Sequence, residues 1–309
     1  MGRLRGMTDE ASIPTERDVA CAADRIRSYI RRTPVIRAEV DGQEVVLKLE
    51  HLQRSGSFKL RGALNALLSG PRPDRVITAS GGNHGAAVAT AAGMLGLPAT
   101  IVVPDSVPDG KARLIESTGA KLIRHGDTYA EAASAAITQA DQPGMRYLPA
   151  YDDAGVVAGQ GTVAAEVVAD VPEVDAIVVA VGGGGLAAGT VLAAGSRKVV
   201  GVEPARCRAL YDALRAGHPV DSTVDSVAAS ALGATRIGDV PFAILRDGAR
   251  STLVTDNDIL LARDRLWREF RLAVEPAAAA PLAALLAGDV PGTLPCLVLC
   301  GANTEWTPR

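Results

Sequence analysis

Short apolar runs rich in β-branched residues alternate along this chain with longer segments of helical periodicity. Strands that alternate with helices form parallel sheets whose faces the helices cover, and near-continuous apolar runs are typical of strands buried on both faces. The pattern therefore predicts an α/β fold built on parallel sheets. The predicted strands span residues 45–49, 75–79, 99–103, 121–124, 176–181, 198–202, 251–254 and 295–299.

The spacing of these elements divides the chain. Between residues 75 and 148 the units are compact, and glycines close their helices, for example at Gly96 and Gly119. We expect residues 71–149 to form a small inserted domain, and residues 1–70 with 150–309 to form a larger one. A length of 309 residues suits two domains, and the cleft between them is the favoured ligand site.

A run of four glycines, Gly182 to Gly185, joins the predicted strand 176–181 to a helical pattern over 187–194. Such a loop lets backbone N–H groups surround one anion, and the helix N-terminus adds positive potential. We interpret the run, with the following Leu186, as a phosphate cup. A flexible turn is the alternative. The spacing matches neither the dinucleotide fingerprint nor the nucleotide P-loop.

Three further segments carry candidate chemistry. Lys59 follows an aromatic residue at a predicted helix start, where an ordinary solvated lysine is the alternative. The loop from Ser80 to Gly85 connects a strand to an Ala-rich helix, which suits a carboxylate, although Ser80 or Asn83 as N-cap and a packed His84 are the structural alternatives. Cys300 ends a predicted strand, where ligands gather in α/β folds, although most such cysteines are inert.

Composition excludes several classes of function. The net charge is −3 with both signs interspersed, so we expect no nucleic-acid partner. The most apolar stretch, 272–286, contains Glu275, Pro276 and Pro281, which argues against a membrane span. The N-terminal nine residues lack the apolar block of a secretory signal, and the cysteines lack disulfide or zinc spacing. We therefore expect a cytoplasmic protein.

Taken in order, the segments resemble the serine/threonine dehydratase branch of the fold-type II (tryptophan synthase β-like) pyridoxal-phosphate (PLP) enzymes, which also contains serine racemase. The resemblance runs from Thr33-Pro34 to Asn303. Besides the tetraglycine, the motifs that carry it are Ser57-Phe58-Lys59-Leu60-Arg61-Gly62-Ala63, Gly82-Asn83-His84, Gly159-Gln160-Gly161-Thr162, Gly201-Val202-Glu203-Pro204, Glu275-Pro276 and Cys300-Gly301-Ala302-Asn303.

The resemblance implies a role for each segment. Lys59 would hold PLP as a Schiff base and serve as the catalytic base. The cofactor would also contact Phe58, Asn83, Gly182, Gly183, Gly184, Gly185, Leu186 and Cys300, with the thiol facing the pyridine nitrogen. The substrate would bind at Ser80, Gly81, Gly82, Asn83 and His84. Self-association is expected from the family.

The implied reaction is α,β-elimination from a 3-hydroxy amino acid such as threonine or serine, giving a 2-oxo acid and ammonia. Gly81 stands where racemases of the family carry a serine, and glycine has no proton to give to the opposite face, so racemisation is disfavoured. The alternatives are another 3-hydroxy amino acid, an ectoine-pathway intermediate, serine racemase, and a PLP-fold binding protein without turnover.

Departures from the family pattern leave two questions open. The family's divalent-metal site would use Glu203, but Ala209 occupies the apparent position of its acidic partner. Ala150 and Tyr151 replace the proline and phenylalanine usual near the cofactor, which leaves the pocket size open. The pattern ends at Asn303, which predicts no amino-acid-responsive regulatory domain.

Overall fold

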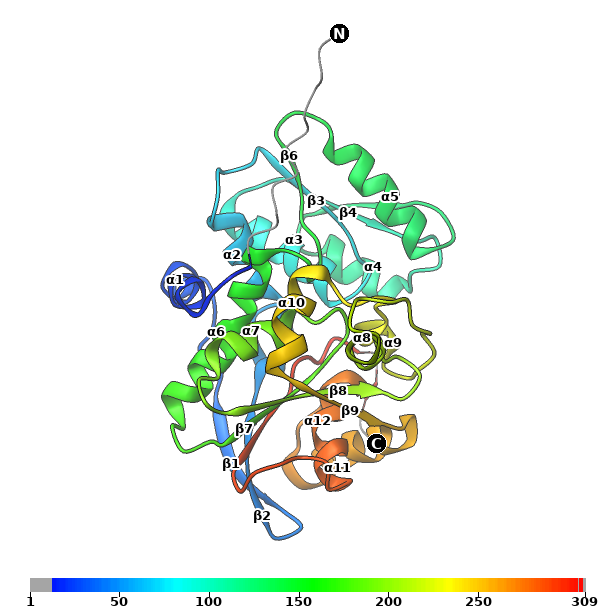
Figure 1. Ribbon diagram of the computed structural model, residues 1–309. Helices are drawn as coiled ribbons and strands as arrows, with labels where there is room; N and C mark the ends of the chain where they lie inside the picture. The colour runs from blue at the N-terminus through cyan, green and yellow to red at the C-terminus, as the bar shows by residue number, and fades with distance from the viewer. Residues whose placement is uncertain (1–12, 305, 308–309) are drawn as a thin grey trace.

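The computed structural model describes residues 13–304 and 306–307 and contains two sheets (Figure 1). The expectation about the N-terminal nine residues lies outside this range. The larger sheet has the order β1 (Val35–Val40), β2 (Gln43–Lys48), β10 (Pro295–Val298), β7 (Ala176–Ala180), β8 (Lys198–Pro204) and β9 (Arg250–Val254). The smaller has the order β5 (Lys121–Arg124), β4 (Ala99–Val103), β3 (Arg75–Ala79) and β6 (Met145–Tyr147), all parallel and within residues 71–149.

These sheets confirm the predicted α/β class, with one correction. The strands β1 and β2 form an antiparallel hairpin, whereas the remaining pairs of the larger sheet are parallel. Asp41 and Gly42 both have positive φ, at 50° and 82°, which is the backbone that a two-residue hairpin turn requires. The sequence Asp41-Gly42 is itself the usual signal for such a turn.

Helices cover both sheets, and Figure 1 places α7 and α12 on opposite sides of the larger one. The larger part of the chain contains α1 (Glu16–Ile26), η1 (Glu50–Leu52), α2 (Lys59–Leu68), α6 (Ala154–Asp170), α7 (Gly185–Ala193), α8 (Ala209–Ala216), α9 (Ala229–Leu232), α10 (Asp239–Gly248), α11 (Asp256–Phe270) and α12 (Pro276–Leu286). The smaller sheet carries α3 (Asn83–Leu95), α4 (Asp109–Glu116) and α5 (Tyr129–Ala140). Across the described range, no helix is both long and apolar enough to span a bilayer.

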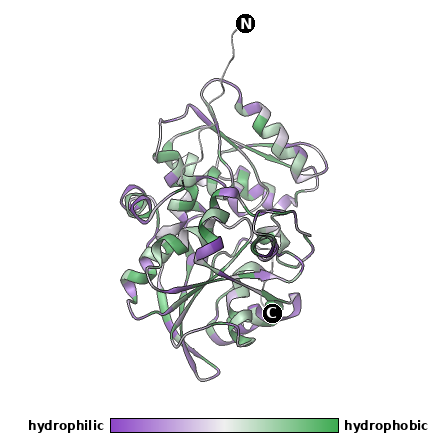
Figure 2. Cartoon of the chain, viewed as in Figure 1, coloured by the Kyte–Doolittle hydropathy of each residue, from purple (hydrophilic) through white to green (hydrophobic). Residues whose placement is uncertain are grey.

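The buried side chains are mostly apolar, and Figure 2 shows hydrophilic residues along outer helices and loops. The helix α12 illustrates the packing: Pro276 occupies its first turn, where the missing N–H costs nothing, and its alanines are buried. Such small side chains let the helix approach strands β7 to β10 closely, with which it makes contact. The segment after Glu275 therefore begins a closely packed helix.

A buried ionic network joins α2 to its neighbours. The guanidinium of Arg61, with no exposed surface, donates to Glu50 Oε1 and Oε2 at 2.7 and 2.9 Å and to Glu166 Oε1 and Oε2 at 2.8 and 2.9 Å. Lys48 Nζ donates to Glu166 at 2.6 Å. Each buried charge thus has opposite charges and hydrogen bonds around it, which offsets its desolvation. The network fixes α2 just after its first residue, Lys59.

Candidate active site

Lys59 is the first residue of α2 and lies at the junction of several segments. Its Nζ donates to the carbonyl of Ala150 at 2.8 Å and lies 5.2 Å from the centroid of the Phe58 ring. The Phe58 amide donates to the carbonyl of Cys300 at 3.1 Å, so the start of α2 abuts the end of β10. Burial lowers the pKa of Lys59 to about 8. The amine is therefore not that of a solvated surface lysine and is readily deprotonated.

The helix that follows the loop after β3 is capped neither by Ser80 nor by Asn83. The helix α3 begins at Asn83, and its N-cap is Gly82, with no side-chain capping bond. Ser80 Oγ instead accepts from the Gly82 amide at 3.2 Å. Because neither Ser80 nor Asn83 caps the helix, the amides of its first turn point toward the carboxyl edge of the sheet without an intrahelical acceptor.

A chain of hydrogen bonds fixes the Asn83 side chain. Asn303 Nδ2 donates to the Ser55 carbonyl at 2.9 Å and to Asn83 Oδ1 at 2.8 Å. Asn83 Nδ2 donates in turn to Glu275 Oε1 at 2.7 Å. The orientation of the Asn83 amide therefore follows from its partners at both ends. One N–H of Asn83 stays available for a cofactor hydroxyl.

Sequence analysis did not identify Glu275 as a site residue. Its side chain is buried, with 3% of the residue exposed, and the charges of Lys59 and Lys111 act on it. Burial raises the pKa of Glu275 to about 7, against the Asn83 hydrogen bond, which lowers it. The Glu275-Pro276 motif was the available signal, and a carboxylate directly before a buried Ala-rich helix could have been read as chemical rather than structural.

His84 matches the packed alternative. Its residue is 5% exposed, and Nε2 lies 3.0 Å from the carbonyl of Leu148, to which the Nε2–H tautomer donates. Burial, and then the charge of Lys59, lower the pKa of His84 to about 3. The neutral imidazole of His84, in α3, thus hydrogen-bonds to the residue that follows β6. This contact gives His84 a supporting place beside the loop.

The tetraglycine connects the end of β7 to the start of α7. Gly184 is the N-cap of α7 with φ +94°, a backbone that L-residues with side chains rarely adopt. The ring of Tyr151 lies so close to Gly183 that a Cβ there would come within 2.2 Å of it. The first amides of α7 have no intrahelical acceptor and are free for an anion.

One short helix lies against both loops. A Cβ on Gly82 would come 3.2 Å from the carbonyl oxygen of Ser230, and a Cβ on Gly182 would come 3.1 Å from Cα of Leu232. Both neighbours belong to α9. The loop Ser80–Gly85 and the tetraglycine, more than ninety residues apart by their numbers, thus contact the same short helix.

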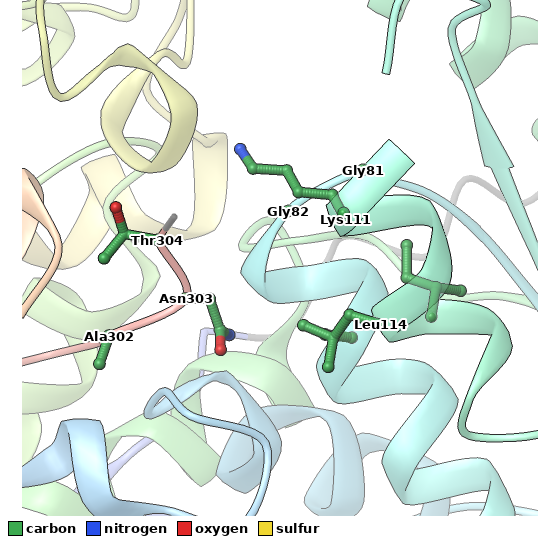
Figure 3. Close-up of a pocket in the computed structure, with 10 residues that line it drawn as sticks. Gly81, Gly82, Lys111, Leu114, Ala302, Asn303 and Thr304 are labelled. Atoms are coloured by element: carbon green, nitrogen blue, oxygen red, sulfur yellow. The ribbon is translucent and has the colours of Figure 1, made fainter. Parts of the chain in front are cut away.

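Beside the loop after β3 lies a pocket of about 220 Å³ (Figure 3). It is lined by Gly81 and Gly82, by Lys111 and Leu114 of α4, and by the segment 302–304 that follows β10. Asn303 therefore borders both the pocket and the hydrogen-bond chain to Glu275. Lys111 could not be identified from the sequence, because a lone lysine in a polar helix has no distinguishing pattern.

The residues at this junction fit PLP. The Lys59 amine suits the aldehyde, the Asn83 amide suits the ring hydroxyl, and the tetraglycine suits the phosphate. Cys300 is 3% exposed, and burial raises the pKa of its thiol, so the sulfur faces its surroundings as a neutral group. The buried Ser57 Oγ has no hydrogen-bond partner within the described chain, as expected beside a site built for a polar group.

The surroundings of Glu203 do not fit a divalent cation. Its Oε1 accepts from the Leu210 amide at 2.7 Å, and its Oε2 accepts from the Tyr211 amide at 2.9 Å and from Ser251 Oγ at 2.7 Å. The carboxylate thus serves the amides at the start of α8. No group of three His, Cys, Asp or Glu side chains is arranged for a metal in the described part of the chain.

A buried lysine amine, a fixed amide and a glycine loop at a helix start, carried by an α/β fold, are the groups that a cofactor enzyme of the PLP type requires. Residues 26–301 match the family described as pyridoxal-phosphate dependent enzymes. The chain belongs to this family, which confirms the resemblance and the cofactor.

Individual relatives agree over nearly the whole chain. It is 38% identical to the L-threonine ammonia-lyase of Geobacter sulfurreducens, across 92% of this chain and 74% of the relative. It is 34% identical to the L-threo-3-hydroxyaspartate ammonia-lyase of Saccharomyces cerevisiae, across 95% and 94%. The structure of maize serine racemase superposes with a TM-score of 0.90 at 29% identity, covering 95% of each chain.

Proposed function

We propose that this protein is a PLP-dependent ammonia-lyase that converts L-threonine or L-serine into a 2-oxo acid and ammonia. The observation that carries the proposal is one-sided proton chemistry at the site. Lys59 supplies an amine whose pKa is about 8, while Gly81 offers no hydroxyl on the loop after β3. A base on one face of the substrate Cα, with no proton donor on the opposite face, favours elimination over inversion of the configuration at Cα. The similarity to an L-threonine ammonia-lyase supports the same reaction.

The chain's own residues divide the work. When bound, PLP supplies the electron sink that acidifies the Cα–H bond of the amino acid. The substrate carboxylate binds the free amides at the start of α3, and Asn83, held by Glu275, orients the ring hydroxyl. Lys59 would hold PLP as a Schiff base, and its amine would accept the Cα proton of the bound amino acid. The Cα proton and the β-hydroxyl would leave together as water, and one water would then hydrolyse the C–N bond to give ammonia and the 2-oxo acid.

The electrostatics of the pocket suit this outcome. A neutral Cys300 thiol beside the pyridine nitrogen would not hold a proton there as an aspartate would, and this would favour loss of the β-hydroxyl. The depressed pKa of Lys59 leaves a useful fraction of neutral amine near neutral pH. Both features favour rapid elimination.

The test is a product assay with L-serine and L-threonine in which 2-oxo acid, ammonia and D-amino acid are measured together. We expect 2-oxo acid and ammonia in equal amounts and little D-amino acid. D-serine that accumulates faster than pyruvate would show a racemase instead. A purified yellow protein without turnover on any 3-hydroxy amino acid would show a binding protein.

A second candidate substrate is L-threo-3-hydroxyaspartate. The observation that favours it is Lys111, whose side chain lines the pocket next to Gly81 and Gly82 and can pair with a second carboxylate. The yeast relative is named for this substrate. The assay should include it, together with the Lys111→Met variant. Loss of activity on hydroxyaspartate but not on threonine in Lys111→Met would establish this preference.

We also propose that the protein self-associates and acts in the cytoplasm, as its family resemblance and scattered free cysteines suggest. Sedimentation equilibrium on the purified chain tests the first point. A single species with the mass of one chain, 31.8 kDa, would contradict it.

A further inference from the structure

Tyr151 occupies a fixed position between the Lys59 amine and the phosphate cup. The residue before it, Ala150, accepts the hydrogen bond from Lys59 Nζ at 2.8 Å. The residue after it, Asp152, accepts through Oδ1 from the Val240 amide of α10 at 2.9 Å. Because both neighbours are tied to separate elements, the backbone of Tyr151 has little freedom, and its side chain is presented in one direction.

That direction is the tetraglycine. The three atoms nearest to a Cβ built on Gly183 all belong to the Tyr151 ring, at 2.2 to 2.3 Å. A Cβ built on Gly185 would meet Cβ of Tyr151 at 3.2 Å. The ring therefore lies directly against the cup, and the absence of a side chain at Gly183 is what leaves room for it.

The hydroxyl at the end of this ring is only weakly engaged. Tyr151 Oη donates to the Arg236 carbonyl at 3.4 Å, at the long limit of a hydrogen bond. Burial raises the pKa of Tyr151 to about 12, so the phenol keeps its proton near neutral pH. A phosphate oxygen is a charged acceptor, and hydrogen bonds to charged acceptors are stronger than those to carbonyls. The hydroxyl would therefore exchange Arg236 for a phosphate in the cup.

We propose that Tyr151 is a phosphate-binding residue of the cofactor site, whose hydroxyl adds one side-chain hydrogen bond to those of the Gly182–Gly185 backbone. This inference rests on the assignment of the cup to the cofactor phosphate. The phenylalanine usual at this position in the family lacks the hydroxyl, so the contact is a property of this chain.

Equilibrium dialysis of the full-length protein against PLP and against pyridoxal, which lacks the phosphate, tests the proposal in wild type, Tyr151→Phe and Tyr147→Phe. Tyr147 is a matched control because it is another half-buried tyrosine, whose pKa burial also raises to about 12. We expect Tyr151→Phe to weaken PLP binding about tenfold, the size of one hydrogen bond to a charged group, and to leave pyridoxal binding unchanged. Tyr147→Phe should change neither affinity.

A second measurement reads the phosphate directly. The ³¹P resonance of PLP in the holoenzyme should shift in Tyr151→Phe and stay in place in Tyr147→Phe. Unchanged PLP affinity in Tyr151→Phe, equal weakening of PLP and pyridoxal, or an unshifted resonance would each overturn the proposal. Because these measurements need no turnover, they are independent of the proposed ammonia-lyase reaction, which its own product assay tests.

Discussion

The side-chain amide of Asn83 donates a 2.7 Å hydrogen bond to Glu275 Oε1. This bond joins the first residue of α3 to the N-cap residue of α12. Asn83 is the predicted partner of the cofactor hydroxyl, and Glu275 sets which way its amide faces. A change in the charge of Glu275 should therefore alter the hydrogen bond to Asn83, the predicted partner of the cofactor hydroxyl.

Protonation of Glu275 should make stability depend on pH. Its pKa is about 7 in the fold, above the value of 4.5 for an unperturbed group, so the folded state binds the proton more tightly. The stabilisation that comes from the protonated Glu275 carboxyl is thus fully present below about pH 4.5 and is lost as the pH rises through about 7. We expect Glu275→Gln to remove this part of the pH dependence, which is worth up to roughly 3 kcal/mol.

Urea unfolding of wild type and Glu275→Gln between pH 5 and 8, roughly the range of maximal stability for proteins, measures the difference. The exposed Glu39→Gln on β1 is the control and should follow the wild type. Parallel pH profiles for wild type and Glu275→Gln would show that the carboxyl group titrates normally.

Lys59 should be the covalent anchor of the cofactor. We expect Lys59→Ala to lack the Schiff-base absorbance of PLP and to lose nearly all turnover, because no other amine is held at this junction by the Ala150 carbonyl. Borohydride reduction of the holoenzyme followed by peptide mass analysis identifies the labelled lysine. The exposed Lys198→Ala should keep both colour and activity. Label on a lysine other than Lys59 would refute the assignment.

Gly184→Val should weaken PLP retention. A Cβ at this position would meet Ile237 Cδ1 at 2.7 Å and Pro241 Cβ at 2.8 Å, and φ is +94°. The left-handed backbone alone costs about 1–2 kcal/mol for an L-residue, so the loop must move away from the phosphate. Gly195→Val is the control, since Gly195 also has positive φ but lies outside the cup. Equal PLP affinity in both folded variants would argue for a hinge rather than a cup.

Replacing Arg61 should lower the free energy of unfolding. Arg61→Met leaves the carboxylate of Glu166 with Lys48 as its ion-pair partner and removes the cation that pairs with the buried carboxylate of Glu50. Breaking a buried ionic network of this kind costs about 3–5 kcal/mol. Denaturant unfolding measures it, and Arg61→Lys, which keeps the charge, should lose less. A loss no larger than that of an exposed arginine such as Arg72→Met would mean that the network contributes little.

Sequence reasoning found the elements whose residues are uniform in character. Parallel strands such as Ala99–Val103 were predicted at the bounds the structure shows, because a mostly buried strand leaves a nearly continuous apolar run. The strands Val35–Val40 and Met145–Tyr147 were missed. Both lie at sheet edges, where one is mixed with charged residues and the other is very short.

The limits at the site have a similar cause. Glycine loops and a lysine in a motif are local signals, so the tetraglycine and Lys59 could be named from the sequence. Glu275, Tyr151 and Lys111 matter through partners far away in the chain, and only the fold brings those together. The role of Glu203 stayed open for the same reason, because its hydrogen bonds to the start of α8 depend on how β8 meets that helix.

Gly81 should decide between elimination and racemisation. The direct test is the Gly81→Ser variant, but a Cβ at residue 81 would come within 2.5 Å of Val107 Cγ2. Gly81→Ser alone would therefore push the loop or α4 aside. Combined with Val107→Ala, which removes both γ carbons, the serine has room for its side chain. The double variant can then present a hydroxyl from the loop after β3.

With Lys59 as base and a hydroxyl donor at residue 81, proton return to the opposite face of Cα becomes available. We expect the Gly81→Ser/Val107→Ala variant to form D-serine from L-serine at a measurable rate alongside pyruvate. Wild type and Val107→Ala alone should form pyruvate with little D-serine. A chiral chromatographic assay and an oxo-acid assay on the same reaction give the ratio. If the double variant binds PLP but its ratio equals that of Val107→Ala, the residue at position 81 does not determine the reaction. If wild type already forms D-serine faster than pyruvate, Ser80 or another group must supply the proton.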